Sequence, residues 1–111
     1  MENLKIILDG CMQNSQREQK KLYEHYYGYC LKIVFRYIYR YEKAVDVVND
    51  GYVKLFRNFS KFQYTQPENM EMILMGWMRT IMVNTAIDYL RKNDFLPEIG
   101  VISEHTWQED K

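Results

Sequence analysis

The sequence predicts an all-α fold: a compact bundle of three main helices plus a short N-terminal helix. Apolar residues recur at three- and four-residue steps in long segments without proline, which is the spacing of amphipathic helices. With 111 residues, of which 47% are hydrophobic, the chain has the size and apolar content of one domain. We expect this domain to span residues 1–94, and residues 95–111 to form a linker or tail.

The sequence lacks the features of several other protein classes. It has no run of about 18 apolar residues and no N-terminal secretory signal, so we expect a cytoplasmic protein without membrane insertion. Cys11 and Cys30 are isolated and are expected to be reduced, and His25 and His105 have no neighbouring ligands for a metal. No phosphate-binding loop or nucleophile elbow is present. We therefore expect no enzyme, no cofactor and no small-molecule substrate.

The first half of the chain predicts a short helix and a long one. Leu4, Ile7, Leu8 and Cys11 form a short amphipathic pattern. Ser15 to Glu18 fits a capping box, so we expect the long helix to start there and to run to about Arg40. Its apolar stripe consists of Leu22, Tyr26, Cys30, Ile33, Val34, Tyr37 and Tyr41. Because the tyrosines follow the helical period, we expect them to pack in the core and at its rim.

A third helix is expected over about Ala44 to Asn58. Its inner face consists of Ala44, Val47, Val48, Gly51, Tyr52, Leu55, Phe56 and Phe59, and its outer row of Asp46, Asn49, Asp50, Val53, Lys54 and Arg57. A glycine within a helix costs about 1 kcal/mol relative to alanine, so Gly51 predicts the close approach of another helix. The outer row is either a solvated face or a binding face.

The last main helix is expected over Met70 to Asn93, after a polar loop at residues 60–69. Its apolar side consists of Ile73, Leu74, Trp77, Met78, Ile81, Met82, Thr85 and Tyr89, and its polar side of Arg79, Thr80, Asn84, Asp88, Arg91 and Lys92. Cations mixed with an amide and a hydroxyl suit nucleic acid, although a solvated polar face fits the same pattern.

Charge is segregated along the chain although the formal net charge is zero. Residues 94–111 contain five acidic residues and one lysine, a net charge of −4, so residues 1–93 carry +4. A mildly basic folded part is compatible with an anionic partner.

Three ordered segments resemble the sigma-70 family of bacterial sigma factors. Gln19 to Tyr27 resembles the opening motif of that family, Ala44 to Phe56 its second motif, and Gly76 to Lys92 its "W-(L/M)-x-R-I" helix. The resemblance covers roughly residues 4–93, and the compact form with a single tryptophan in this helix is similar to the extracytoplasmic-function type. The resemblance thus identifies residues 1–94 with the −10-binding region 2 domain, a non-catalytic specificity subunit for transcription initiation.

The resemblance implies one surface for RNA polymerase and another for promoter DNA. The outer row of the third helix would dock on the clamp helices of the β′ subunit through Asp46, Asn49, Asp50, Val53 and Lys54. The loop would capture a flipped base of the non-template strand, with Phe62 and Tyr64 able to stack on it. The contacts of the last helix with the −10 DNA would come from Arg79, Thr80, Asn84, Arg91 and Lys92.

This chain departs from the family pattern in three places. Thr80 replaces the family's arginine and Arg79 puts a cation one place earlier, about 100° around the helix. Trp77 is followed by Met78, where primary sigma factors have a pair of aromatic residues. Trp77 itself lies on the apolar side, where we expect it to pack in the core. The −35-binding helix-turn-helix domain is absent after Asn93, so we expect a fragment. The alternative is a helical interaction module that acts mainly through an anti-sigma or adaptor partner.

Overall fold

The computed structural model describes residues 3–63 and 67–92, and within these ranges the chain is helical with no strand. The helices are α1 (Leu4–Met12), α2 (Gln16–Phe35), α3 (Tyr41–Arg57) and α4 (Met70–Lys92). Two short 3₁₀ turns, Phe59–Lys61 and Pro67–Asn69, lie between α3 and α4. This confirms the predicted all-α bundle of three main helices and a short N-terminal one. Residues 93–111, including the expected linker or tail, lie outside the described residues.

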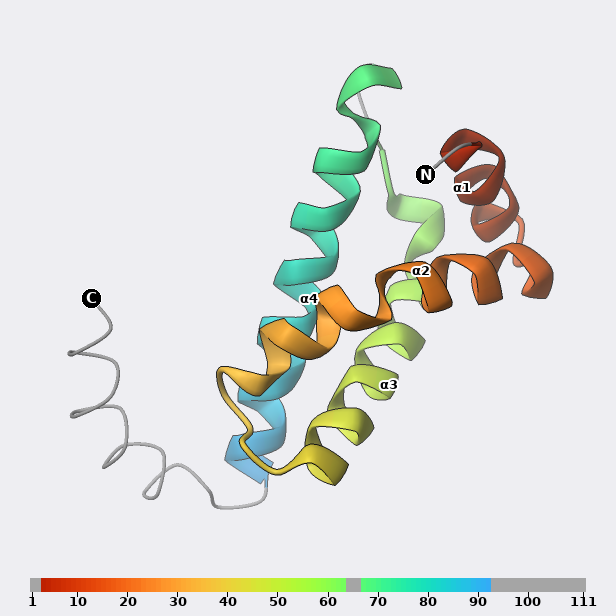
Figure 1. Cartoon of the computed structure of the whole chain (residues 1–111). Coiled ribbons are helices and arrows are strands. Elements are labelled where there is room, and N and C mark those ends of the chain that lie inside the picture. The colour runs from red at the N-terminus through yellow and green to blue at the C-terminus, as the bar shows by residue number, and fades with distance from the viewer. Residues whose placement is uncertain (1–2, 64–66, 93–111) are drawn as a thin grey trace.

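The three long helices enclose one core, and α1 covers the first turns of α2 (Figure 1). α3 and α4 run antiparallel, because Gly51 lies against Met82 while Phe59, just after α3, lies against Trp77. α2 crosses both helices and is bonded to each. All four apolar residues of the short N-terminal pattern are buried, as the amphipathic spacing predicted.

The start of α2 is correct in the prediction, but the capping box is not formed. Ser15 is the N-cap residue, yet its side chain makes no capping hydrogen bond. Its backbone N–H instead donates to the carbonyl of Gly10 at 2.8 Å, so Glu18 has no free amide to reach back to. The Glu18 side chain lies over Gly10, since a Cβ atom added to that glycine would be 2.6 Å from the Cβ atom of Glu18. The carboxylate of Glu18 pairs with the ammonium group of Lys21 at 3.7 Å.

The junction between α2 and α3 also differs from the expectation. α2 ends at Phe35 rather than near Arg40, and α3 begins at Tyr41 rather than Ala44. The backbone N–H groups of Tyr37 and Ile38 both donate to Val34, and this turn places the Ile38 side chain in the core. Tyr41 therefore leaves the α2 stripe and is exposed at the start of α3.

Gly51 is explained by the close approach of α4, as predicted. A Cβ added at this position would meet the Sδ of Met82 and would lie 2.8 Å from its Cε atom. Met82 is fully buried, so a displaced side chain would have to repack within the core. The missing side chain of Gly51 allows α3 and α4 to pack together.

α4 buries a row of residues that repeats strictly every four positions. The row consists of Met70, Leu74, Met78, Met82, Ala86 and Leu90. Rows with this spacing are inclined to the helix axis and fit neighbours that cross at an angle. The predicted apolar side of this helix is therefore right for the middle of the helix. At the end of the helix Ala86 and Leu90, which were not predicted, are buried, whereas the predicted Tyr89 is only half-buried.

Candidate functional site

The outer row of α3 forms a continuous exposed surface. Asp46, Asn49, Asp50 and Val53 are all exposed, because α3 turns its opposite side to α2 and α4. Val53 is 48% exposed and is one of few large apolar side chains at the surface of the described residues. An acidic row that ends in an exposed valine offers both charge and apolar area to a protein partner.

Asn49 is held in place by a tyrosine from another helix. The hydroxyl of Tyr23, in α2, donates to Oδ1 of Asn49 at 2.8 Å. The Tyr23 ring is itself fixed against Tyr52, with ring centroids 4.6 Å apart. This leaves the amide NH₂ of Asn49 available to a partner. The prediction missed Tyr23, since nothing in the sequence indicates a bond between residues 26 positions apart.

Lys54 continues this row but also belongs to the contact with α4. Its Nζ atom lies 3.7 Å from Oδ2 of Asp88, and both side chains are about half exposed. Exposed ion pairs of this kind contribute little to stability. Lys54 therefore belongs both to the outer row and to the contact between α3 and α4. The sequence prediction did not include its ion pair with Asp88.

The structure does not support the predicted role of Phe62 in stacking on a DNA base. The Phe62 ring is only 5% exposed and packs between Phe59 and Trp77, with centroids 5.6 and 5.1 Å away. The same cluster holds Trp77 against Phe59 at 5.3 Å, so the expected core packing of Trp77 is confirmed. The error has a physical cause: a loop aromatic next to a helix can close the end of the core. Tyr64 lies outside the described residues.

The polar residues of α4 divide into two groups around the helix. Thr80, Asn84 and Arg91 lie along one flank, and all three are exposed, as is Lys92 in the last turn. The Thr80 hydroxyl donates to the carbonyl of Gly76 at 3.1 Å, which leaves its oxygen as an acceptor. Arg79 is also exposed but lies about 100° around the helix from Thr80.

Two tyrosines of α2 fix the first half of α4. The hydroxyl of Tyr26 donates to Oε2 of Glu71 at 2.6 Å, and that of Tyr29 to the carbonyl of Met75 at 3.0 Å. Burial, followed by the bond to Glu71, raises the pKa of Tyr26, so this hydroxyl remains a donor. These bonds orient the end of α4 that follows the loop.

The described residues include no group of three or more His, Cys, Asp or Glu side chains that could hold a metal ion. Burial, together with the nearby Glu18, raises the pKa of the Cys11 thiol to about 12, and burial raises that of Cys30 to about 11. Neither cysteine is a nucleophile near neutral pH. No helix in the described part of the chain is long and apolar enough to cross a membrane.

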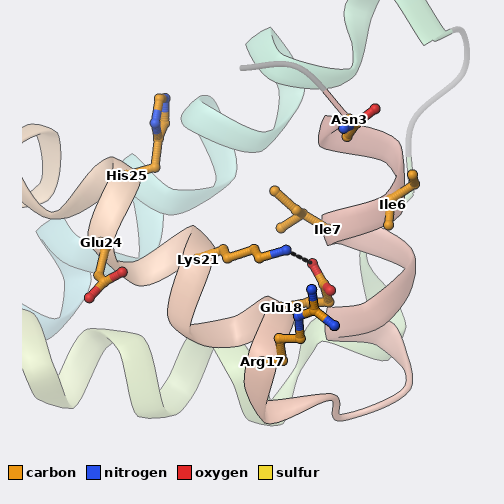
Figure 2. A pocket seen from close by; sticks show the side chains of 8 residues that line it. All are labelled: Asn3, Ile6, Ile7, Arg17, Glu18, Lys21, Glu24 and His25. Atoms are coloured by element: carbon orange, nitrogen blue, oxygen red, sulfur yellow. Dashed lines mark ion pairs between the residues drawn. The ribbon is translucent and has the colours of Figure 1, made fainter.

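A pocket of about 800 Å³ lies between α1 and α2, away from the residues above (Figure 2). Its lining consists of Asn3, Ile6, Ile7, Arg17, Glu18, Lys21, Glu24 and His25. Lys21 points to Glu18, whereas His25 points away from this pair (Figure 2). Two cations face two anions, so the pocket has no net charge that would select a charged ligand.

Comparison with known proteins identifies one family. The model of the family described as Sigma-70 region 2 matches residues 22–95, which is more than half of the 111 residues. No curated protein and no solved structure matches the chain. The matched range contains most of α2 and all of α3 and α4, and therefore the exposed rows of both α3 and α4.

Proposed function

The chain belongs to the sigma-70 region 2 family, and from this premise we propose that it joins RNA polymerase to the promoter −10 element through two separate surfaces. Region 2 is a non-catalytic DNA-binding part of sigma factors that acts with RNA polymerase in transcription initiation. One observation carries the proposal: α3 and α4 each expose their own row of polar side chains, which leaves one helix for polymerase and the other for DNA. Polymerase and DNA can therefore be bound at the same time.

The polymerase surface is the outer row of α3. Asp46, Asp50 and Val53 are exposed, and Asn49 is oriented by Tyr23. These side chains suit a helical partner with cations and apolar residues, and in this proposal the partner is the pair of clamp helices of the β′ subunit. Lys54 lies at the edge of the contact, because its ammonium group already faces Asp88.

The DNA surface is the exposed flank of α4 together with the loop before it. Asn84 can bond to base edges or to the strand, and Thr80 can accept a hydrogen bond. Arg91 and Lys92 suit phosphates. Capture of a flipped non-template base is assigned to the loop, with Tyr64 as the stacking residue in place of the buried Phe62. Stacking and edge bonds must offset an unstacking cost of a few kcal/mol.

The extracytoplasmic-function type is part of this proposal. It is supported by the compact helical region and by Trp77 followed by Met78, where primary sigma factors have an aromatic pair. An anti-sigma partner that covers either exposed row would inhibit the protein without any catalytic step.

Two binding measurements test the proposal. In a pull-down with a β′ clamp-helix fragment, Asp46→Ala and Asp50→Ala should each weaken binding, whereas Glu24→Ala, which removes an exposed acid from α2, should not. If the fragment does not bind, or if both α3 variants bind like the wild type, the docking surface is wrong.

The second measurement is fluorescence anisotropy with labelled single-stranded oligonucleotides. A −10-like sequence should bind more tightly than a scrambled one, and Asn84→Ala or Tyr64→Ala should reduce that difference. Equal affinity for both sequences, combined with a steep dependence on salt, would indicate charge attraction alone and would contradict the proposal.

A further inference from the structure

The junction between α2 and α3 has a backbone that is held at both ends. At one end, the backbone N–H groups of Tyr37 and Ile38 both donate to the carbonyl of Val34, and the Ile38 side chain is buried. At the other end, the backbone N–H of Ala44 donates to the carbonyl of Arg40 at 2.9 Å, which closes the first turn of α3. Side chains of the junction that do not enter the core are therefore presented from a fixed position.

Two tyrosines and three cations are presented there. Tyr39 is 49% exposed and Tyr41 is 58% exposed, which is unusual for large rings in the described part of the chain. Arg36, Arg40 and Lys43 are exposed as well, and none of them belongs to an ion pair found among the described residues. Exposed aromatic rings beside arginines are typical of surfaces that bind a partner.

The stability of α3 does not explain the cations at its start. The N-terminus of a helix carries a partial positive charge, which disfavours Arg40 at the N-cap position and Lys43 in the first turn. Arg40 also makes no capping hydrogen bond with its side chain, whereas the residues preferred at this position do. An anionic partner therefore accounts for these two cations better than the fold does.

The end of α4 adds two more cations to the same end of the bundle. α3 and α4 are antiparallel, so the start of α3 lies beside the end of α4 (Figure 1). Residues 36–43 and 91–92 together contain five cations and one acid, a net charge of +4. We call the exposed tyrosines and cations of these two ranges the basic end: Arg36, Tyr39, Arg40, Tyr41, Lys43, Arg91 and Lys92.

We propose that the basic end binds the acidic segment of the same chain, residues 94–111. The net charge of this segment is −4, which is opposite and equal to that of the basic end. Its acids are interspersed with apolar residues, among them Phe95, Ile99 and Trp107, which suit the exposed rings of Tyr39 and Tyr41.

The segment is also joined to the surface that it would bind. It begins two residues after Lys92, and an extended chain spans about 3.3 Å per residue, so half of the segment can reach about 30 Å. A short connection gives the segment an effective concentration in the millimolar range, roughly, at the basic end. A contact built from exposed charges and two rings is weak between separate molecules, but it can be populated within one chain.

This inference goes beyond the proposed function, because it adds a competitor for part of the DNA surface. Arg91 and Lys92 are assigned to DNA phosphates there, and the bound segment would cover them. The contact itself does not depend on that assignment, whereas its effect on DNA rests on it. A chain with the segment bound would bind an anionic strand more weakly than its exposed cations predict.

Paramagnetic relaxation enhancement in the full chain tests the contact. Cys11 and Cys30 are fully buried, so a nitroxide label attaches at an introduced Ser103→Cys. The amide signals of the α2–α3 junction, residues 39–40, are compared with that of Leu8 in α1 at about 0.05 M salt, where exposed charges are weakly screened. Circular dichroism checks that all the labelled variants remain helical.

The signals of residues 39–40 should broaden, and the signal of Leu8 should not. Arg40→Gln/Lys43→Gln should reduce the broadening about two- to fivefold, as expected when exposed ion pairs are lost. Glu98→Gln/Glu104→Gln should reduce it by a similar factor from the other side of the contact.

The control removes two exposed cations from the opposite ends of α2 and α3, by Lys20→Gln/Arg57→Gln, and should leave the broadening unchanged. A segment that only hangs from the end of α4 would broaden the same signals equally in every variant. That result, an absence of broadening, or an equal reduction by the control would overturn the proposal.

Fluorescence anisotropy with a −10-like single strand separates this inference from the proposed function. Glu98→Gln/Glu104→Gln should raise the affinity of the full chain about two- to fivefold, because the apparent affinity falls with the fraction of molecules whose site is covered. If the label reports the contact but the affinity does not change, the inference stands, and the assignment of Arg91 and Lys92 to DNA fails.

Two other outcomes would assign the basic end to something else. A rise in affinity without the label contact would come from the change in net charge alone. A loss of affinity in Arg40→Gln/Lys43→Gln, with the label contact unaltered, would mean that the basic end holds DNA and not the acidic segment. Either outcome would contradict the proposed contact.

Discussion

Single side chains with contacts to another helix decide how the exposed rows are presented. Asn49 has its carbonyl oxygen bonded to the Tyr23 hydroxyl, and this bond selects one orientation of the amide. Without the bond, the amide rotates freely at the surface and must be ordered when a partner binds. Tyr23 is thus a positioning residue for the α3 row, although it belongs to α2.

We expect Tyr23→Phe to weaken binding to the β′ clamp fragment by about 2- to 10-fold, which corresponds to the 0.5–1.5 kcal/mol of one hydrogen bond. The phenylalanine ring keeps the contacts with Tyr52 and Tyr27. Binding is measured in a double-mutant cycle with Asn49→Ala, and the two effects should not add, because both remove the same interaction. Additive losses, or an equal loss for Tyr27→Phe, would contradict this role.

Phe62 shows how a residue near a binding loop can have a structural role instead. The family resemblance implied that Phe62 could stack on a base, but the ring closes the core between Phe59 and Trp77. In the proposed function, the contact with DNA is therefore left to other residues of the loop. Local sequence does not distinguish these two roles, since both favour an aromatic residue there.

At the scale of the helices, the three glycines within α2, α3 and α4 should respond to alanine in opposite directions. Gly28→Ala and Gly76→Ala add a methyl group to open space and should stabilise the fold by about 0.5–1 kcal/mol each. Gly51→Ala pushes against the fully buried Met82 and should destabilise it by about 1–3 kcal/mol. Urea unfolding measures all three. A Gly51→Ala protein as stable as the Gly28→Ala protein would show that Met82 can move aside at no cost.

The helices and their exposed rows could be predicted from the sequence, because amphipathic spacing is a local property. The α3 row was predicted residue by residue, and all of its members except the partly covered Lys54 are exposed. Apart from the close approach at Gly51, the contacts between helices could not be predicted. The four-residue row of α4 depends on how the neighbours cross it, and the amide of Ser15 bonds to Gly10 rather than to Glu18 because α1 and α2 meet there.

At the scale of the whole molecule, ionisable groups within the core make the fold sensitive to alkaline pH. Cys11 comes from α1, Cys30 from α2 and Tyr52 from α3, and the Cys30 thiol donates to the Tyr52 hydroxyl at 3.5 Å. Burial is the main cause of the raised pKa of each group. The three helices thus share an interior that accepts these groups only in their neutral forms.

Stability should therefore be fully present below pH 9 and should fall as the pH rises from 9 towards 11. In this window the unfolded chain releases thiol protons at its ordinary pKa of 9.0, while the folded chain keeps them because its thiols have pKa values of about 12 and about 11. The unfolded state then binds fewer protons, so the free energy of unfolding decreases with pH. The two thiols together should cost about 2–3 kcal/mol at pH 10 relative to pH 8.

Urea unfolding in the presence of a reductant, at pH 8 and pH 10, measures this loss. Cys11→Ala removes one of the two thiols and should lower stability at pH 8 through lost packing, yet it should reduce the loss between pH 8 and 10 by about 1 kcal/mol. Cys30→Ala should also reduce the loss between pH 8 and 10. Equal effects of the two variants would mean that the pH dependence comes from the shared interior and not from one helix. Equal stability of the wild type at both pH values would mean that the thiols ionise inside the fold, and the buried core described for α1, α2 and α3 would have to be open to water.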